Sequence, residues 1–141
     1  MSGFPAAIIL RTDYSRVFSL ERFVDGFTAV PTSARLRAKL VASELFDNLL
    51  AHGRDIRPPI VVLSLSAGPP LALTFRFRSS NLSEFIAAAE AAKKGLGVEA
   101  TKRYDSEAGL YRGFGLFMCG RLSSSIRARR GLLWHRVSVV F

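Results

Sequence analysis

The sequence predicts an α+β fold, a two-layer α/β sandwich in which helices cover one face of a mixed, mostly antiparallel sheet. Three observations lead to this prediction. Apolar residues have helical spacing over 15–27 and 34–52, and alternating β-rich runs form two hairpins, at 60–77 and at the C-terminal end. With 141 residues, 49% of them hydrophobic, the chain suits a single domain spanning 1–141.

The first half of the chain predicts a strand and two helices. A short strand is expected around Ala7–Leu10, followed by a helix over Ser15–Phe27. The segment Val30-Pro31-Thr32-Ser33 supplies a turn and an N-cap for a long helix over Ala34–His52, which Gly53 ends. One apolar row on this helix and the residues expected beside it give a broad core-facing stripe: Ala38, Ala42, Leu45 and Leu49, then Leu36, Leu40 and Leu50.

The second half predicts two hairpins separated by helices and a polar loop. Ile60–Ser66 and Leu71–Phe77 alternate in hydropathy across a Gly-Pro-Pro turn, which indicates a hairpin. Asn81 and Glu84 resemble a capping box for a helix over Leu82–Lys94. The remaining expected elements are a polar loop over Val98–Arg112, a helix over Gly115–Ser123, and a closing hairpin of Ser125–Arg130 and Leu132–Phe141, whose last strand directs Leu133, His135, Val137, Val139 and Phe141 to one side.

Two short segments have the composition of a nucleotide site. Glu44 and Asn48 lie one turn apart on one helix face, so a carboxylate and a carboxamide could address the same metal ion and attacking group. Gly113 and Gly115 lead directly into an apolar helical run, where a backbone can approach phosphates at a helix N-terminus. An ordinary surface glutamate with a polar helix-end residue, and a plain helix entry, are the structural alternatives.

In this order, the two segments resemble the nucleotide site of the Bergerat-type ATPases, and the spelling with His52-Gly53 most resembles the bacterial anti-sigma factor serine kinases. The resemblance implies ATP and Mg²⁺ as cofactors. The resemblance implies that Glu44 acts as, or assists, the catalytic general base. It also implies that Asn48 coordinates the metal ion and contacts the nucleotide.

The resemblance also assigns residues to the phosphates. Gly113, Phe114, Gly115 and Leu116 would form the phosphate cradle, and Arg112 could neutralise terminal phosphate charge. The resemblance also places His52 at the nucleotide site. Capping or packing at the end of the helix is the alternative role for this residue.

Both adenine contacts of the resembled family are altered in this chain. Where the family has an aspartate that accepts the adenine amino hydrogen, the sequence runs Phe77-Arg78-Ser79, and an arginine offers only donors. The family's late glycine-threonine pair appears here as Gly131-Leu132. A missing acceptor at a buried contact costs about 1–3 kcal/mol, so nucleotide affinity could fall roughly ten- to hundredfold.

Three functions of different classes therefore remain open. The first is an ATP-dependent serine/threonine protein kinase of the anti-sigma type, a regulator of bacterial transcription whose partner is a sigma factor or an antagonist-like protein. A homodimer is also implied by the resemblance. The second is a protein-interaction module of the same fold with weak or no nucleotide binding. The third, nucleic-acid binding, rests only on the net charge of +9 and is disfavoured because the arginines form no readout module.

Composition sets the expected compartment. No apolar run approaches the roughly 18 residues of a membrane span, and the N-terminus lacks the pattern of a secretory signal, so a cytoplasmic protein without a membrane partner is expected. The single cysteine, Cys119, lies in an apolar helical context and is expected to be buried and structural.

Overall fold

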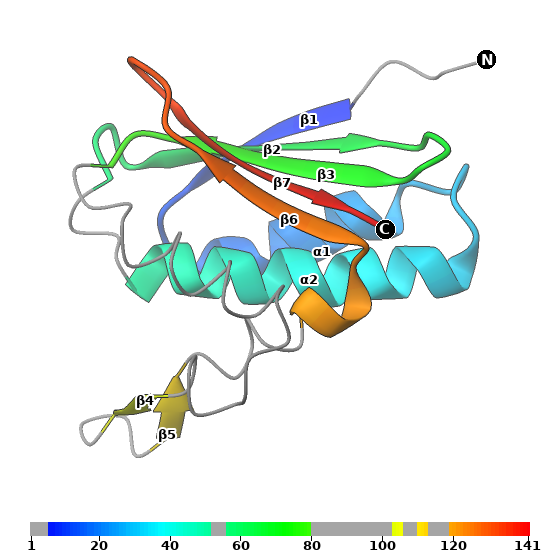
Figure 1. Ribbon diagram of the computed structural model, residues 1–141, viewed down its shortest axis with the longest axis horizontal. Coiled ribbons are helices and arrows are strands. Elements are labelled where there is room, and N and C mark those ends of the chain that lie inside the picture. The colour runs from blue at the N-terminus through cyan, green and yellow to red at the C-terminus, as the bar shows by residue number, and fades with distance from the viewer. Residues whose placement is uncertain (1–5, 52–55, 80–102, 106–109, 113–118) are drawn as a thin grey trace.

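The computed structural model describes residues 6–51, 56–79, 103–105, 110–112 and 119–141. Two longer helices follow the first strand, and the elements named after them are strands (Figure 1). In order they are β1 (Ala6–Arg11), the 3-10 turn η1 (Tyr14–Arg16), α1 (Val17–Asp25), α2 (Thr32–Ala51), β2 (Ile60–Ser66), β3 (Ala72–Phe77), β4 (Arg103–Asp105), β5 (Leu110–Arg112), β6 (Ser125–Arg129) and β7 (His135–Val140).

Five strands form one sheet in the order β1-β2-β3-β7-β6, and every strand pairing among the described residues is antiparallel. The α+β class and both predicted hairpins are confirmed, whereas the expected mixture of parallel and antiparallel strands is absent from the described part. The reason lies in the connections. Two tight turns join β2 to β3 and β6 to β7, and two consecutive helices between β1 and β2 return the chain antiparallel to its start (Figure 1).

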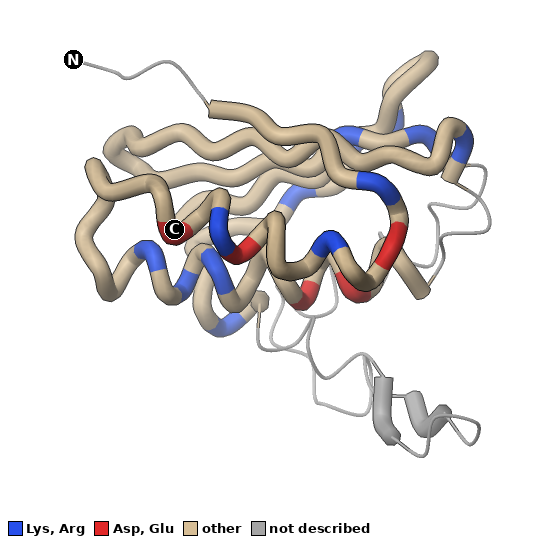
Figure 2. The backbone as a smooth tube through the Cα atoms, turned by 180° about the vertical axis from the view of Figure 1, so that it is seen from behind, with Lys and Arg blue, Asp and Glu red and all other residues tan. Residues whose placement is uncertain are grey.

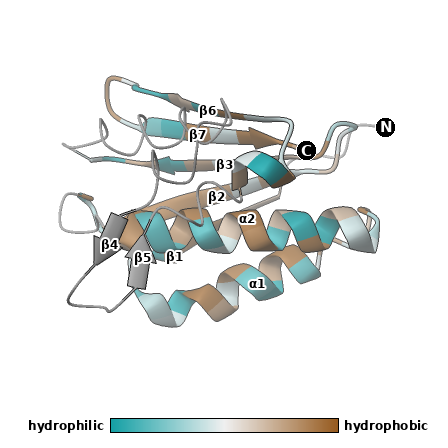
Figure 3. Ribbon diagram, turned by 60° about the horizontal axis from the view of Figure 1, so that its bottom comes forward, coloured by the Kyte–Doolittle hydropathy of each residue, from teal (hydrophilic) through white to brown (hydrophobic). Residues whose placement is uncertain are grey.

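Helices α1 and α2 lie side by side against one face of the sheet (Figures 1 and 3). The predicted row on α2 is buried, and its neighbours Val41 and Phe46 are buried with it. The inward residues of the central strands complete the core: Val61, Leu63, Leu65, Leu73, Phe75, Phe77, Val137 and Val139. One layer of helices on one sheet face is therefore the architecture, as predicted.

The expected width of the α2 stripe is wrong at two positions. Leu36 and Leu40 are 49% and 56% exposed. At 100° per residue, each lies about 160° around the helix from Ala38, so they belong to the opposite side of α2. Burial of Leu36 and Leu40 does not follow from their hydropathy.

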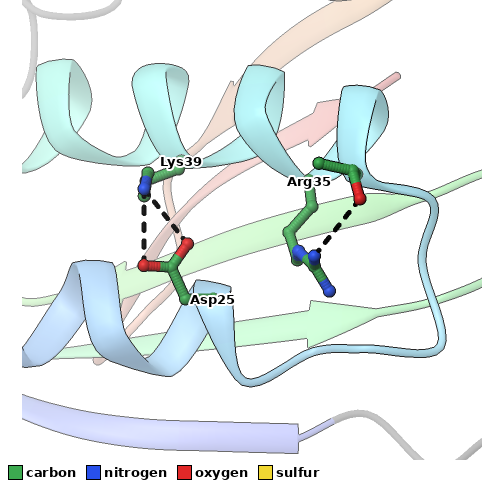
Figure 4. A network of polar contacts seen from close by, with 4 residues as sticks. Asp25, Arg35 and Lys39 are labelled. Carbon is green, nitrogen blue, oxygen red and sulfur yellow. Dashed lines mark hydrogen bonds and ion pairs between the residues drawn. The ribbon is translucent and has the colours of Figure 1, made fainter.

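An exposed ion pair joins the two helices, and a second polar contact lies within α2 (Figure 4). The ammonium group of Lys39 on α2 pairs with the carboxylate of Asp25 on α1 at 3.1 Å. Arg35 donates a long hydrogen bond of 3.5 Å to the hydroxyl of Thr32 in the first turn of α2. These exposed contacts add to the apolar packing and do not replace it.

Several predicted boundaries move. The first helix begins as the turn η1, and α2 begins at Thr32, two residues before the predicted start, because the amide of Arg35 already bonds the carbonyl of Pro31 at 2.9 Å. The expected loop over 98–112 contains the strand pair β4–β5. Leu133 is 67% exposed before β7 begins, so it is not on the inward side of that strand. The helix expected over 82–94 lies outside the described residues, while residues 119–122 are helical as predicted.

Candidate functional site

Glu44 and Asn48 occupy the second half of α2 and are connected directly. The Asn48 side-chain nitrogen Nδ2 donates a 2.8 Å hydrogen bond to the main-chain oxygen of Glu44. This bond fixes which way the carboxamide faces, because only Nδ2 can donate. The Oδ1 atom of Asn48 keeps its acceptor capacity, and a hard oxygen of this kind is what Mg²⁺ prefers.

The Glu44 carboxyl is exposed at the surface of α2, yet its surroundings favour the protonated form. Partial burial raises the pKa of Glu44 above its ordinary value of 4.5, and the neighbouring charge of Asp47 raises it further. A carboxyl group whose pKa is raised toward neutrality is a stronger base once it is ionised. The environment of Glu44 is therefore compatible with the role of general base.

Cys119 connects the segment after the second glycine to the same part of α2. Its thiol is buried and donates a long hydrogen bond of 3.8 Å to the carbonyl oxygen of Val41, one turn before Glu44. Burial raises the pKa of Cys119 to about 12, and the charge of Glu44 contributes in the same direction. The prediction that Cys119 is buried is confirmed.

The remaining predicted site residues are less fully described. His52, Gly113, Phe114, Gly115 and Leu116 lie outside the described residues. Arg112 is the last residue of β5, where it is in register with Arg103, and its side chain is not among those described. The structure thus joins Asn48 to Glu44 and brings Cys119 near Glu44, and the phosphate cradle stays a prediction.

The end of β3, where the resembled family has its aspartate, is held by main-chain contacts. The carbonyl of Arg78 accepts a 3.2 Å hydrogen bond from the amide of Arg57, while the Arg78 side chain is exposed. The carbonyl of Ser79 lies 2.7 Å from Nε2 of His135. Because a carbonyl can only accept, Nε2 is the donor in this contact. The Nδ1 atom of His135 is buried without a hydrogen-bond partner among the described residues.

A hollow of about 350 Å³ lies on the other face of the sheet, lined by Val62, Arg76, Trp134, His135 and Arg136. It is distinct from the pocket predicted beside Glu44 and Asn48, since α2 covers the opposite sheet face (Figure 1). No motif in the sequence marks these residues as a group. Alternation puts Arg76 on the polar side of its strand, but only the strand order brings Arg76 and Arg136 together.

The described part of the chain contains neither a metal-ligand cluster nor a membrane-spanning helix. Its His, Cys, Asp and Glu side chains form no cluster of three or more that could hold a metal ion, so a magnesium site would depend on Asn48 and the phosphates of a nucleotide. None of its helices combines the length and the apolar character needed to cross a membrane. In comparisons with known proteins, no family model and no curated protein matches this chain.

Proposed function

We propose that this protein is an ATP-binding regulator of the anti-sigma factor type. Its proposed reaction is transfer of the terminal phosphoryl group of ATP to a serine or threonine hydroxyl of a small antagonist protein. The observation that carries the proposal is the arrangement on α2. Asn48 has its Nδ2 atom committed to the Glu44 carbonyl, which leaves Oδ1 available beside a carboxyl group of raised pKa.

Each residue has a role in this proposal. Asn48 Oδ1 would complete the coordination of Mg²⁺, whose other ligands would be phosphate oxygens and water. Glu44 would orient the attacking hydroxyl and accept its proton. Cys119, four residues after Gly115 in the sequence, contacts α2 at Val41. That contact supports a phosphate cradle next to Glu44 and Asn48.

A second candidate function is favoured by one observation. Arg78 stands where the resembled family has its adenine-binding aspartate, and the carbonyls of Arg78 and Ser79 are engaged in hydrogen bonds at the end of β3. A protein of this fold that binds partners without nucleotide turnover would need no acceptor there.

Calorimetric titration with magnesium-ATP separates the two candidates. For the regulator we expect a dissociation constant in roughly the micromolar range. Asn48→Ala should abolish this binding without unfolding the protein, because the side chain lies on a solvent-accessible part of α2. Ser43→Ala is the matched control, since it removes a small polar group from another side of the same helix turn.

A second measurement tests phosphoryl transfer. Glu44→Gln should retain ATP binding and lose transfer of labelled phosphate to protein substrates, because the carboxamide cannot accept the proton. Absence of ATP binding in the natural sequence, or equal binding in Asn48→Ala, would refute the nucleotide function and leave the interaction module.

A further inference from the structure

Three arginines form a row across adjacent strands on the sheet face opposite the helices. Arg76 on β3 lies directly opposite Arg136 on β7, and Arg136 lies directly opposite Arg129 on β6. All three are exposed. Directly opposed residues share a sheet face with Cβ atoms about 5 Å apart, so three like charges are held close together. Like charges in this arrangement destabilise a sheet unless a counter-charge approaches them.

The sheet itself supplies no counter-charge. Not one aspartate or glutamate occurs in β1, β2, β3, β6 or β7. In Figure 2 the acidic positions colour the helical layer and the turn after β1, whereas the sheet carries only basic colour. The arginine row therefore has a charge that a partner from outside this sheet could neutralise.

Apolar and aromatic groups adjoin the row. The hollow of about 350 Å³ has Val62 and Trp134 as walls beside Arg76 and Arg136. The tip of the β6–β7 hairpin, which projects from the sheet in Figures 1 and 2, exposes two leucines, Leu132 fully and Leu133 at 67%. Tryptophan and arginine are the residues most enriched at binding hot spots. This combination suits a ligand that has acidic and apolar groups next to each other.

We propose that this face, made by Arg76, Arg129, Arg136 and Trp134, binds an acidic segment of a partner protein whose carboxylates alternate with apolar side chains. One side chain of that segment would enter the hollow, and the others would lie over Arg136 and Arg129. The shape argues against a bilayer, because a flat membrane surface cannot fill a hollow between Val62 and Trp134. The single tryptophan of the chain argues against single-stranded nucleic acid, which stacks on several aromatic side chains in succession.

Trp134 gives the test its own signal, since it is the only tryptophan in the protein. A short synthetic peptide that alternates Glu and Leu should change the fluorescence of Trp134 saturably. A Lys/Leu peptide of equal length should leave it unchanged. We expect the double variant Arg76→Gln with Arg136→Gln to bind the Glu/Leu peptide with an affinity at least about tenfold lower. The control Arg22→Gln with Arg37→Gln removes the same charge from exposed helix positions and should bind like the natural protein.

Additional variants and ligands distinguish the other classes of partner and control for misfolding of the double variant. If the double variant loses the circular dichroism spectrum of the folded protein, the single charge reversal Arg136→Glu is tested instead. This variant should bind the Glu/Leu peptide more weakly and the Lys/Leu peptide more tightly than the natural protein does. Failure of the Glu/Leu peptide to bind, or equal loss in the Arg22 and Arg37 control, would overturn the proposal. It would also be overturned if oligothymidylate or phosphatidylserine vesicles bound more tightly than the peptide and lost binding in the same variant. Asn48→Ala should not alter peptide binding, so this proposal and the nucleotide function fail independently.

Discussion

The thiol of Cys119 donates a 3.8 Å hydrogen bond to the main-chain oxygen of Val41, a residue 78 positions earlier in the chain. This contact joins the C-terminal helical segment to α2 at a point one turn before Glu44. It also puts the thiol within electrostatic reach of the Glu44 carboxylate, whose charge helps to raise the pKa of Cys119. Residues far apart in the chain are thus connected through a buried cysteine at the same part of α2 as Glu44.

Cys119 is expected to be unreactive in the native protein. Its pKa is raised from 9.0 to about 12, so at pH 8 its thiolate fraction is about a thousandfold below that of an ordinary thiol. Ellman's reagent should therefore react very slowly with the folded protein and at once with the protein in denaturant. A fast reaction under native conditions would show that the segment after Gly115 detaches readily from α2.

Glu44→Gln should stabilise the protein at neutral pH. Since the pKa of Glu44 is raised in the folded state, its contribution favours folding below 4.5 and is lost as pH rises through the folded value. The neutral amide avoids both the partial desolvation of the charge and the repulsion from Asp47. Because Glu44 is exposed, the gain should stay within about 0.5 kcal/mol.

Melting temperatures at pH 7 and below pH 4.5 check this prediction. The same substitution on α1, Glu21→Gln, gives the general effect of removing one negative charge from a chain of net charge +9. The prediction fails if Glu44→Gln stabilises no more than Glu21→Gln at pH 7, or if its advantage persists at acidic pH.

Replacing either of two leucines on α2 by alanine should lower the free energy of unfolding by very different amounts. Leu45 is fully buried against the sheet, and Leu45→Ala should cost about 2–5 kcal/mol of unfolding free energy. Leu40 is 56% exposed, so the identical change there should stay within about 0.5 kcal/mol. Urea denaturation of both variants measures the difference. A large loss in Leu40→Ala would mean that this side chain is covered in solution.

The ion pair between Lys39 and Asp25 should contribute little to the free energy of unfolding. Its side chains are 27% and 54% exposed, and exposed pairs of this kind typically give about 0.2–1 kcal/mol of coupling. A double-mutant cycle with Lys39→Met and Asp25→Asn measures that coupling free energy. We expect it to fall further in high salt, because mobile ions screen exposed charges. Coupling that is large and independent of salt would contradict this expectation.

Local pattern was enough to predict most of the elements and the core row of α2. The buried positions Ala38, Ala42, Leu45 and Leu49 follow from the helical period, and both hairpins follow from alternation around turn residues. The same helical period puts Leu36 and Leu40 on the other side of α2, so their expected burial rested on hydropathy alone and was wrong. The strand pair β4–β5 was also missed, since its three-residue strands are too short to show a period.

The sequence by itself determined the α+β class, the position of Glu44 one turn before Asn48, and the absence of an acceptor side chain at Arg78, since each depends on residue type and local spacing alone. Only the tertiary structure decided that Cys119 contacts α2 and that Arg76, Arg136 and Arg129 stand in one row. Arg76 and Arg136, like Cys119 and Val41, lie far apart in the chain. Strand order and register aligned the arginines, and both depend on how the whole sheet buries its apolar face against the helices.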